Sequence, residues 1–288
     1  MHGAGFLFFV FGAIFGSFLN VVALRYESDK PLFGGQLFGR SHCPHCNKTL
    51  RFFELIPILS FFILRGKCAR CKSPLSLAYP MGELATALSF ATIPGIVMKV
   101  FPGSLLDWTA WGIAAVIAAA FASLIVAALV DLRLFIIPDE IHYILIILAV
   151  VSGFLMAPHF GPARGAYTGG YSLIFGFHDT LLPNRILGAV VGGVFFLALY
   201  FVTLKRGMGL GDVKLAASIG LFMGWPDGFL ACMLAFCFGT AVMLPMLLLR
   251  RTRLKSYVPF GPFLSLAAIV VMIWGDSILR GYFHLFRG

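Results

Sequence analysis

The stretch Ala110–Val130 reads Ala-Trp-Gly-Ile-Ala-Ala-Val-Ile-Ala-Ala-Ala-Phe-Ala-Ser-Leu-Ile-Val-Ala-Ala-Leu-Val, an apolar run of 21 residues without a charged side chain. A helix needs about 20 mainly apolar residues to cross the hydrocarbon core of a bilayer. The stretch therefore predicts a membrane-spanning helix. A carboxylate, Asp131, follows it directly.

Further apolar runs occur on both sides of this one. The first of them has neither a basic leading region nor a small-residue cleavage site, so we expect it to remain as a helix and not to be removed as a signal peptide. The sequence thus predicts an all-α polytopic membrane protein with about eight transmembrane helices, of which the sixth is short. The other expected spans are Gly3–Leu24, Met81–Met98, Ile141–Ala157, Ile186–Leu204, Val213–Gly224, Gly228–Leu249 and Pro259–Gly275.

The composition agrees with a bilayer environment. Of the 288 residues, 60% are hydrophobic and only 12% are charged, whereas a soluble domain has about 25% charged residues. A soluble protein of this size needs more polar surface than that. An ordinary globular enzyme, a disordered chain and a nucleic-acid-binding module are therefore excluded. We expect the net charge of +10 to reflect membrane topology and contact with anionic lipid.

The positions of the basic residues predict the orientation of the chain. With the N-terminus outside, segments 25–80, 131–140, 205–214 and 250–258 lie inside and contain 17 of the 22 Lys and Arg residues, which leaves 5 outside. Basic residues favour the cytoplasmic side of membrane proteins. We therefore expect the N-terminus outside and residues 25–80 in the cytosol.

The insert at residues 25–80 contains two Cys-x-x-Cys pairs separated by 21 residues. Two such pairs in a short segment are typical of a tetrahedral Cys₄ zinc site, and a metal supplies folding free energy that a small insert lacks. Two disulfides, a redox role or four unused thiols are the alternatives, although disulfides are rare in the cytosol. The candidate ligands are Cys43, Cys46, Cys68 and Cys71.

Other features of the chain favour structural roles. The apolar segment Phe52–Leu64 is too short to span a membrane and contains a proline, so we expect it to dock at the membrane interface. Cys232 and Cys237 lie in an expected span, and we interpret them as inert core thiols. The Gly-rich stretch His159–Asn184 predicts an outside loop.

Three aspartates lie at the expected cytosolic ends of spans, where a charged group costs free energy. Asp139 follows a proline at the start of a span and is well explained as a helix N-cap, and Asp212 can also cap a helix. Asp131 is at a helix C-terminus, where an anion is unfavourable, so a structural role explains it least. Two facing carboxylates can share a proton and perform aspartic proteolysis.

Two other classes of function remain open. Intramembrane aspartates also serve as proton relays, so the same residues are compatible with an ion-coupled transporter that is not an enzyme. A zinc-stabilised scaffold without catalysis is the other, and it leaves Asp131 unexplained. We expect no nucleic-acid partner, and the sequence does not indicate an oligomeric state.

Several motifs together resemble the prepilin leader peptidase family, whose members process type IV prepilins and type II secretion pseudopilins. The resemblance covers most of the chain, from the first span through both cysteine pairs to a Gly-x-Gly-Asp motif. The similar stretches are Gly16-Ser-Phe-Leu-Asn20, Glu54-Leu-Ile-Pro-Ile-Leu-Ser-Phe, Tyr79-Pro-Met-Gly-Glu83, Asp131 eight residues before Asp139, and Gly209-Leu-Gly-Asp212-Val-Lys.

The resemblance implies cleavage of a short basic leader after a glycine, on the cytosolic side of a bacterial inner membrane, followed by N-methylation with S-adenosylmethionine. It implies that Asp131 and Asp212 are catalytic, that Asp139 is not one of the pair, and that the four cysteines bind zinc. No motif identifies the methyl-donor site, for which Glu83 is a candidate.

These motifs and apolar runs predict three parts in the chain. We expect a first transmembrane helix at residues 1–24, a cysteine-containing insert at 25–80 and a membrane-embedded peptidase domain at 81–288.

Overall fold

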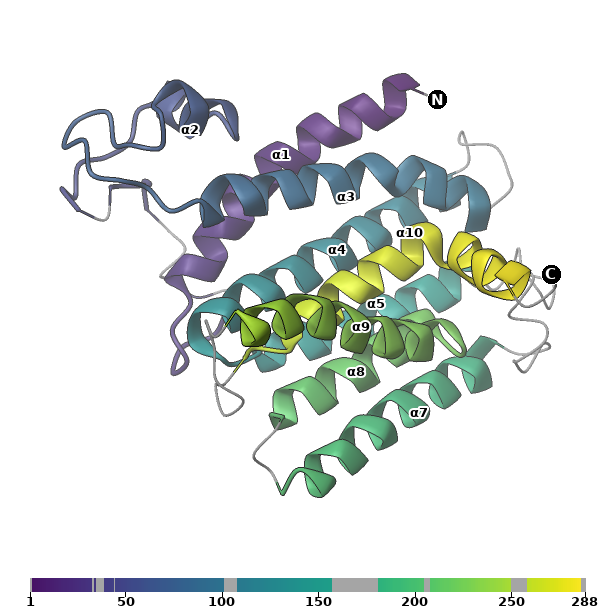
Figure 1. The fold of residues 1–288 in the computed structure, drawn as a ribbon. Helices are drawn as coiled ribbons and strands as arrows, with labels where there is room; N and C mark the ends of the chain where they lie inside the picture. The colour runs from purple at the N-terminus through teal and green to yellow at the C-terminus, as the bar shows by residue number, and fades with distance from the viewer. Residues whose placement is uncertain are drawn as a thin grey trace. The chain divides into compact units, whose positions relative to one another are not determined.

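The computed structural model describes residues 2–32, 34, 39–43, 45–100, 108–156, 181–204, 208–249 and 258–285. These residues form helices, with no strand among them. By contacts the chain divides into two compact units, Met1–Pro94 and Gly95–Gly288, each of which is described by itself (Figure 1). The three-part division expected from the sequence stays a prediction.

In the first unit, α1 (His2–Arg25) packs against the beginning of α3 (Ala78–Val100). A Cβ atom on Gly12 would lie 2.7 Å from Phe90 Cβ, and one on Gly16 would lie 2.9 Å from Glu83 Cα. The glycine spacing gives α1 a flat face that lets another helix approach closely, as small residues do in membrane proteins. This contact brings Glu83 against α1.

Between α1 and α3 lie only short elements, the 3₁₀ turn η2 (Phe52–Leu55) and α2 (Leu59–Ile63). Neither of them buries a residue. The side chains of Phe52, Phe62 and Ile63 are exposed. The segment is too short to span, as expected, and its docking to the membrane interface stays a prediction.

The second unit contains α4 (Trp108–Leu134), α5 (Asp139–Met156), α7 (Leu181–Val202), α8 (Leu210–Met223), α9 (Asp227–Leu248) and α10 (Gly261–Leu285). Helix α8 packs on α5, α7, α9 and α10. Figure 1 shows α8 between α7 and α9. Helix α8 is therefore the central short element of this unit.

Glycines allow α7 and α8 to touch through their backbones. A Cβ on Gly188 would overlap the carbonyl oxygen of Gly220, and one on Gly192 would lie 2.9 Å from the carbonyl oxygen of Ala216. Since the two helices have little room for side chains between them, α8 is held closely against α7. Helix α8 then ends at Gly224, whose φ of 82° is a conformation that glycine adopts at low cost.

The described residues include seven helices that are long and apolar enough to cross a membrane. The expected short span at Val213–Gly224 corresponds to α8, whose 14 residues extend only about 21 Å, less than the hydrocarbon core of about 30 Å. The polytopic all-helical class is confirmed, but the count of eight spans is not. The seven are Gly3–Arg25, Ala78–Lys99, Trp108–Leu134, Asp139–Met156, Leu181–Val202, Asp227–Leu248 and Gly261–Leu285.

Two smaller expectations need correction. Cys232 is buried as expected, but Cys237 is exposed on α9 because the outer face of a peripheral helix carries residues of any apolar kind. The predicted loop His159–Asn184 lies mostly outside the described residues, and its last four residues, Leu181–Asn184, already belong to α7.

Candidate functional site

Asp131 and Asp212 lie close to each other in the second unit. Asp131 is in the last turn of α4, and Asp212 is in the first turn of α8. Their exposed fractions are 4% and 8%. The two carboxyl groups are close enough to interact electrostatically. Helix packing therefore brings these two predicted residues into one buried acidic site.

The carboxylate of Asp131 interacts with the start of another helix. The backbone N–H of Gly261 donates to Asp131 Oδ2 at 2.9 Å, and Gly261 is the first residue of α10. The N-terminus of a helix carries partial positive charge that favours an anion. The expectation that Asp131 has no capping role is therefore wrong, because the partner helix is remote in the sequence.

Glycine is the residue that this contact requires at position 261. A Cβ there would lie 2.6 Å from Asp131 Oδ2, which is too short for nonbonded atoms. The absence of a side chain at Gly261 thus lets a carboxylate approach the backbone. The sequence offered no direct signal for this role, since Gly261 is far from both aspartates along the chain.

Asp212 is held by the turn that precedes it. Gly209 is the N-cap of α8, and its backbone N–H donates to Asp212 Oδ2 at 3.1 Å. Asp212 is thus not the N-cap itself but the third helical residue, which reaches back as in a capping box. Both aspartates accept a backbone hydrogen bond near a helix start.

Ile137 connects the surroundings of the two carboxylates. Its side chain is 3.5 Å from the position that a Cβ on Gly211 would occupy and 3.2 Å from that of Gly261. The segment between α4 and α5 therefore passes between the first residues of α8 and of α10. An apolar side chain there excludes water from one side of the acidic pair.

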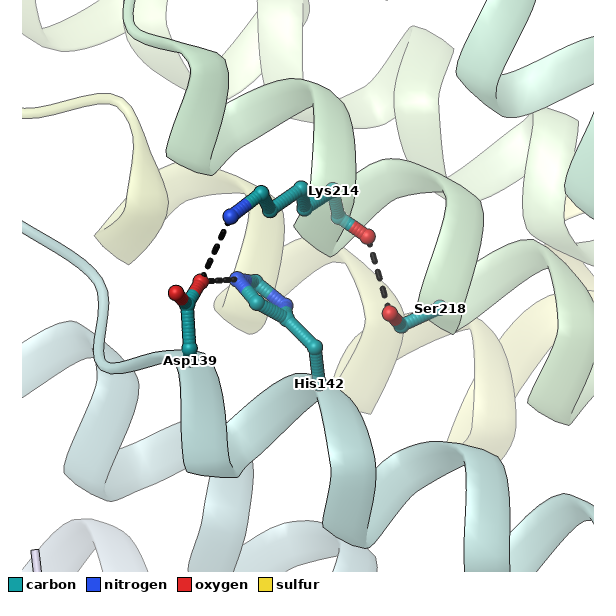
Figure 2. A network of polar contacts seen from close by, with 4 residues as sticks. All are labelled: Asp139, His142, Lys214 and Ser218. Atoms are coloured by element: carbon teal, nitrogen blue, oxygen red, sulfur yellow. Dashed lines mark hydrogen bonds and ion pairs between the residues drawn. The ribbon is translucent and has the colours of Figure 1, made fainter. Parts of the chain in front are cut away.

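Asp139, the third predicted aspartate, has a different partner. It is the first residue of α5, and its Oδ1 accepts a hydrogen bond from Lys214 Nζ at 2.7 Å. Figure 2 shows this ion pair with His142 beside it. The expected helix start at Asp139 is correct, and its carboxylate is joined to α8.

The four cysteines of the insert form a cluster. Their Sγ atoms all lie within 4.8 Å of one another, and those of Cys43 and Cys71 are 3.8 Å apart. Tetrahedral coordination with Zn–S bonds of about 2.3 Å requires sulfur atoms about 3.8 Å apart. The donor set and its size therefore fit a metal ion.

The two cysteine pairs lie in equivalent loops. In the first loop, Cys43 N donates to the carbonyl oxygen of Lys48, and in the second, Cys68 N donates to that of Ser73. The residue after the second cysteine of each loop, Asn47 or Lys72, has a positive φ. The insert thus contains the same backbone turn twice, although only the cysteines match between the two loops.

Cys71 has an additional polar partner. Its Sγ is 2.9 Å from the hydroxyl of Ser73, and this hydrogen bond lowers the pKa of the thiol to about 6. A thiolate is the form that binds a metal. The side chains of His42 and His45, which flank the cluster, are exposed.

Glu83, the candidate for the methyl-donor site, belongs to the first unit. It is 8% exposed, and its Oε2 accepts the N–H of Ile58 at 2.6 Å. Ser17 of α1 also hydrogen-bonds to the carboxylate. Glu83 thus joins α3 to α1 and to the residue before α2.

Comparison with known proteins gives a consistent result. Residues 10–95 match the bacterial peptidase A24 N-terminal domain, and residues 118–244 match the type IV leader peptidase family. No solved structure matches.

Several curated proteins are similar over nearly their full length, and each is named prepilin leader peptidase/N-methyltransferase. The protein from Aeromonas hydrophila is 31% identical, with 98% of this chain and 96% of that protein covered. Those from Pseudomonas aeruginosa and Bacillus subtilis are each 32% identical, with 94% and 98% of this chain and 90% and 99% of the relative covered. This chain therefore belongs to the type IV leader peptidase family.

Proposed function

We propose that this protein removes the leader peptide from type IV prepilins or pseudopilins by a two-aspartate mechanism that uses Asp131 and Asp212. Family membership makes the protein a leader peptidase with N-methyltransferase activity. The observation that supports the two residues is that both carboxylates are buried, Asp212 in the first turn of α8 and Asp131 hydrogen-bonded to the first residue of α10. Since two close carboxylates do not readily ionise together, they share one proton.

The shared proton gives the two carboxyl groups different roles. The ionised one accepts a proton from water as the water oxygen attacks the scissile carbonyl carbon. The protonated one donates its proton to the carbonyl oxygen, which gives a tetrahedral intermediate. Collapse of this intermediate breaks the C–N bond: the carboxyl group that took the proton of water gives it to the leaving amine, and the other carboxylate takes back the proton from the former carbonyl oxygen. Backbone hydrogen bonds from Gly209 and Gly261 keep the two carboxyl groups oriented.

We place this reaction at the cytosolic face of a bacterial inner membrane. The distribution of 17 against 5 basic residues supports an outside N-terminus under the positive-inside rule. A prepilin whose apolar helix is in the bilayer leaves its basic leader in the cytosol. The scissile bond then lies at the interface, which is where the expected orientation puts the ends of α4 and α8.

Substitution of either aspartate tests the mechanism. We expect Asp131→Asn and Asp212→Asn each to reduce cleavage of a purified prepilin by about 10²–10⁴-fold or more, because general acid–base catalysis is lost. Cleavage is measured by gel shift with purified enzyme in lipid nanodiscs. Asp276→Asn, which changes an aspartate paired with Arg280 on α10, is the control. Normal cleavage by either active-site variant would contradict the proposal.

We also propose that the metal in the cysteine cluster is zinc with a structural role. Four thiolates within tetrahedral reach support this choice, since Cys₄ sites in small inserts are typical of structural zinc. The four cysteines hold the ion and thereby close the two loops against each other. Metal analysis of the purified protein is expected to give about one zinc per chain.

For methyl transfer we propose S-adenosylmethionine as the donor and Glu83 as the first residue to test. When bound, S-adenosylmethionine would supply the methyl group for the new N-terminal amine. A buried carboxylate suits a cationic ligand, but the protein donors at Ile58 and Ser17 already contact it. Calorimetric titration of S-adenosylmethionine into Glu83→Gln separates the roles: weaker binding supports a ligand contact, and unchanged binding assigns Glu83 to structure alone.

A further inference from the structure

A polar network joins the start of α5 to the first turns of α8 (Figure 2). Lys214 Nζ donates to Asp139 Oδ1 at 2.7 Å, and His142 Nε2 is 4.0 Å from the same oxygen. The hydroxyl of Ser218 donates to the carbonyl oxygen of Lys214 at 2.8 Å. The proposed two-aspartate chemistry uses none of these groups.

The network contacts a different side of α8 from the one that carries Asp212. Lys214 follows Asp212 by two residues, so their side chains leave the helix about 200° apart. Lys214 is therefore directed away from the acidic pair and toward α5. The ion pair holds α8 from the side opposite to its catalytic carboxylate.

The partner of Lys214 directly follows the segment that lies between the first residues of α8 and of α10. Asp139 follows Ile137 by two residues, and Ile137 lies against Gly211 and Gly261. A shift of the first turn of α8 relative to this segment changes where Asp212 stands with respect to Asp131. The ion pair is the polar connection that opposes such a shift.

His142 indicates that the network is built for this purpose and is not an incidental surface contact. The side chain is 5% exposed, and neither of its ring nitrogens has a hydrogen-bond partner among the described residues. A buried polar group without a partner costs free energy. The imidazole nevertheless faces the carboxylate of Asp139, with Nε2 4.0 Å from Oδ1.

We propose that the Asp139–Lys214 ion pair, backed by His142, is a positioning element that fixes the first turn of α8 and thereby the location of Asp212 opposite Asp131. This inference rests on the proposed two-aspartate function. Asp139 and Lys214 act through Asp212 and touch neither the water nor the peptide. The inference also gives a role to Asp139, the aspartate of the motif that is outside the catalytic pair.

A charge-swap series tests the proposal. The variants are Asp139→Asn, Lys214→Met, the double neutral variant, and the double swap Asp139→Lys with Lys214→Asp. Asp276→Asn with Arg280→Met removes an exposed ion pair on α10 and is the matched control. For each purified protein in nanodiscs, kcat and KM are measured with a prepilin that carries a basic leader, and the unfolding temperature is recorded.

We expect each single substitution to lower kcat on the order of 10–100-fold, as small misplacements of catalytic groups do, with KM little changed. The double neutral variant is expected to be no slower than the singles, because the two residues act as one unit. The charge swap is expected to recover much of kcat. The α10 control is expected to match the unchanged enzyme.

Three results would overturn the inference. They are an unchanged kcat in both single variants, a loss of kcat that only accompanies a lower unfolding temperature, and a charge swap that is slower than both singles. The last result would mean that one residue contacts the substrate directly. The proposed two-aspartate function is tested separately, and it is rejected only if Asp131→Asn or Asp212→Asn still cleaves the prepilin. If both aspartate variants are inactive and Lys214→Met is fully active, the positioning role alone is rejected.

Discussion

The cysteine cluster and the acidic pair are assembled in different ways. All four cysteines come from one short segment, in two loops with the same backbone hydrogen bonds. The two aspartates come from α4 and α8, which are separated in the chain by α5 and α7. The cluster therefore depends on its ligands, and the acidic pair depends on how remote helices pack. Substitutions distant from the site should disturb only the second.

Loss of metal ligands is expected to have the largest effect. Structural zinc contributes about 10–16 kcal/mol in small zinc-binding peptides, so Cys43→Ser with Cys68→Ser should eliminate bound metal and unfold the insert. Elemental analysis and limited proteolysis measure both changes. Cys237→Ser, which alters an exposed thiol on α9, should retain full metal content. A metal-free double variant with a protease-resistant insert would contradict a structural metal.

The packing of α7 on α8 should show the next largest effect. Gly220→Ala places a methyl group against the backbone of Gly188, and overpacking of this kind costs about 1–3 kcal/mol. Because α8 carries Asp212, cleavage should fall together with the unfolding temperature while metal content stays unchanged. Gly281→Ala is the control, since nothing lies within 4 Å of a Cβ there. Wild-type stability and cleavage in Gly220→Ala would show that α7 and α8 can move apart without loss of function.

Gly261→Ala should affect cleavage more than folding. The new methyl carbon would lie 2.6 Å from Asp131 Oδ2, which is too close, and the carboxylate is therefore displaced. We expect kcat to fall on the order of 10–100-fold, with a smaller change in unfolding temperature than in Gly220→Ala. Steady-state cleavage of a prepilin measures the loss. Equal kcat in Gly261→Ala and Gly281→Ala would argue against a need for close approach at this position.

The smallest effect is expected at the hydrogen bond to Cys71. Ser73→Ala removes the hydroxyl that contacts Cys71 Sγ, and loss of such a supporting group typically weakens metal binding about 10–100-fold. Competition with a chelator measures the affinity. Thr49→Val, at the end of the other loop, serves as the control. An unchanged affinity in Ser73→Ala would show that the hydroxyl does not support the thiolate.

The sequence predicted local features well and long-range contacts poorly. The spans were predicted because about 20 apolar residues in succession have few alternatives to a membrane helix. The contact of Asp131 with the start of α10 was not predicted, because that helix begins at Gly261, far from Asp131 along the chain. Similarly, Asp139 was correctly placed at a helix start, but its bond to Lys214 depends on where α5 meets α8.

The sequence by itself determined that this protein is a helical membrane protein, which residues are its acidic and cysteine candidates, and how close its cysteine ligands are along the chain. Those properties follow from hydrophobicity, charge and short spacing, all of which are local. Only the tertiary structure decided that Asp131 lies beside Asp212, that glycines admit the close approach of α7 to α8, and that Lys214 holds α8 to α5. These contacts arise from helix packing, which depends on residues from distant parts of the chain fitting together at once.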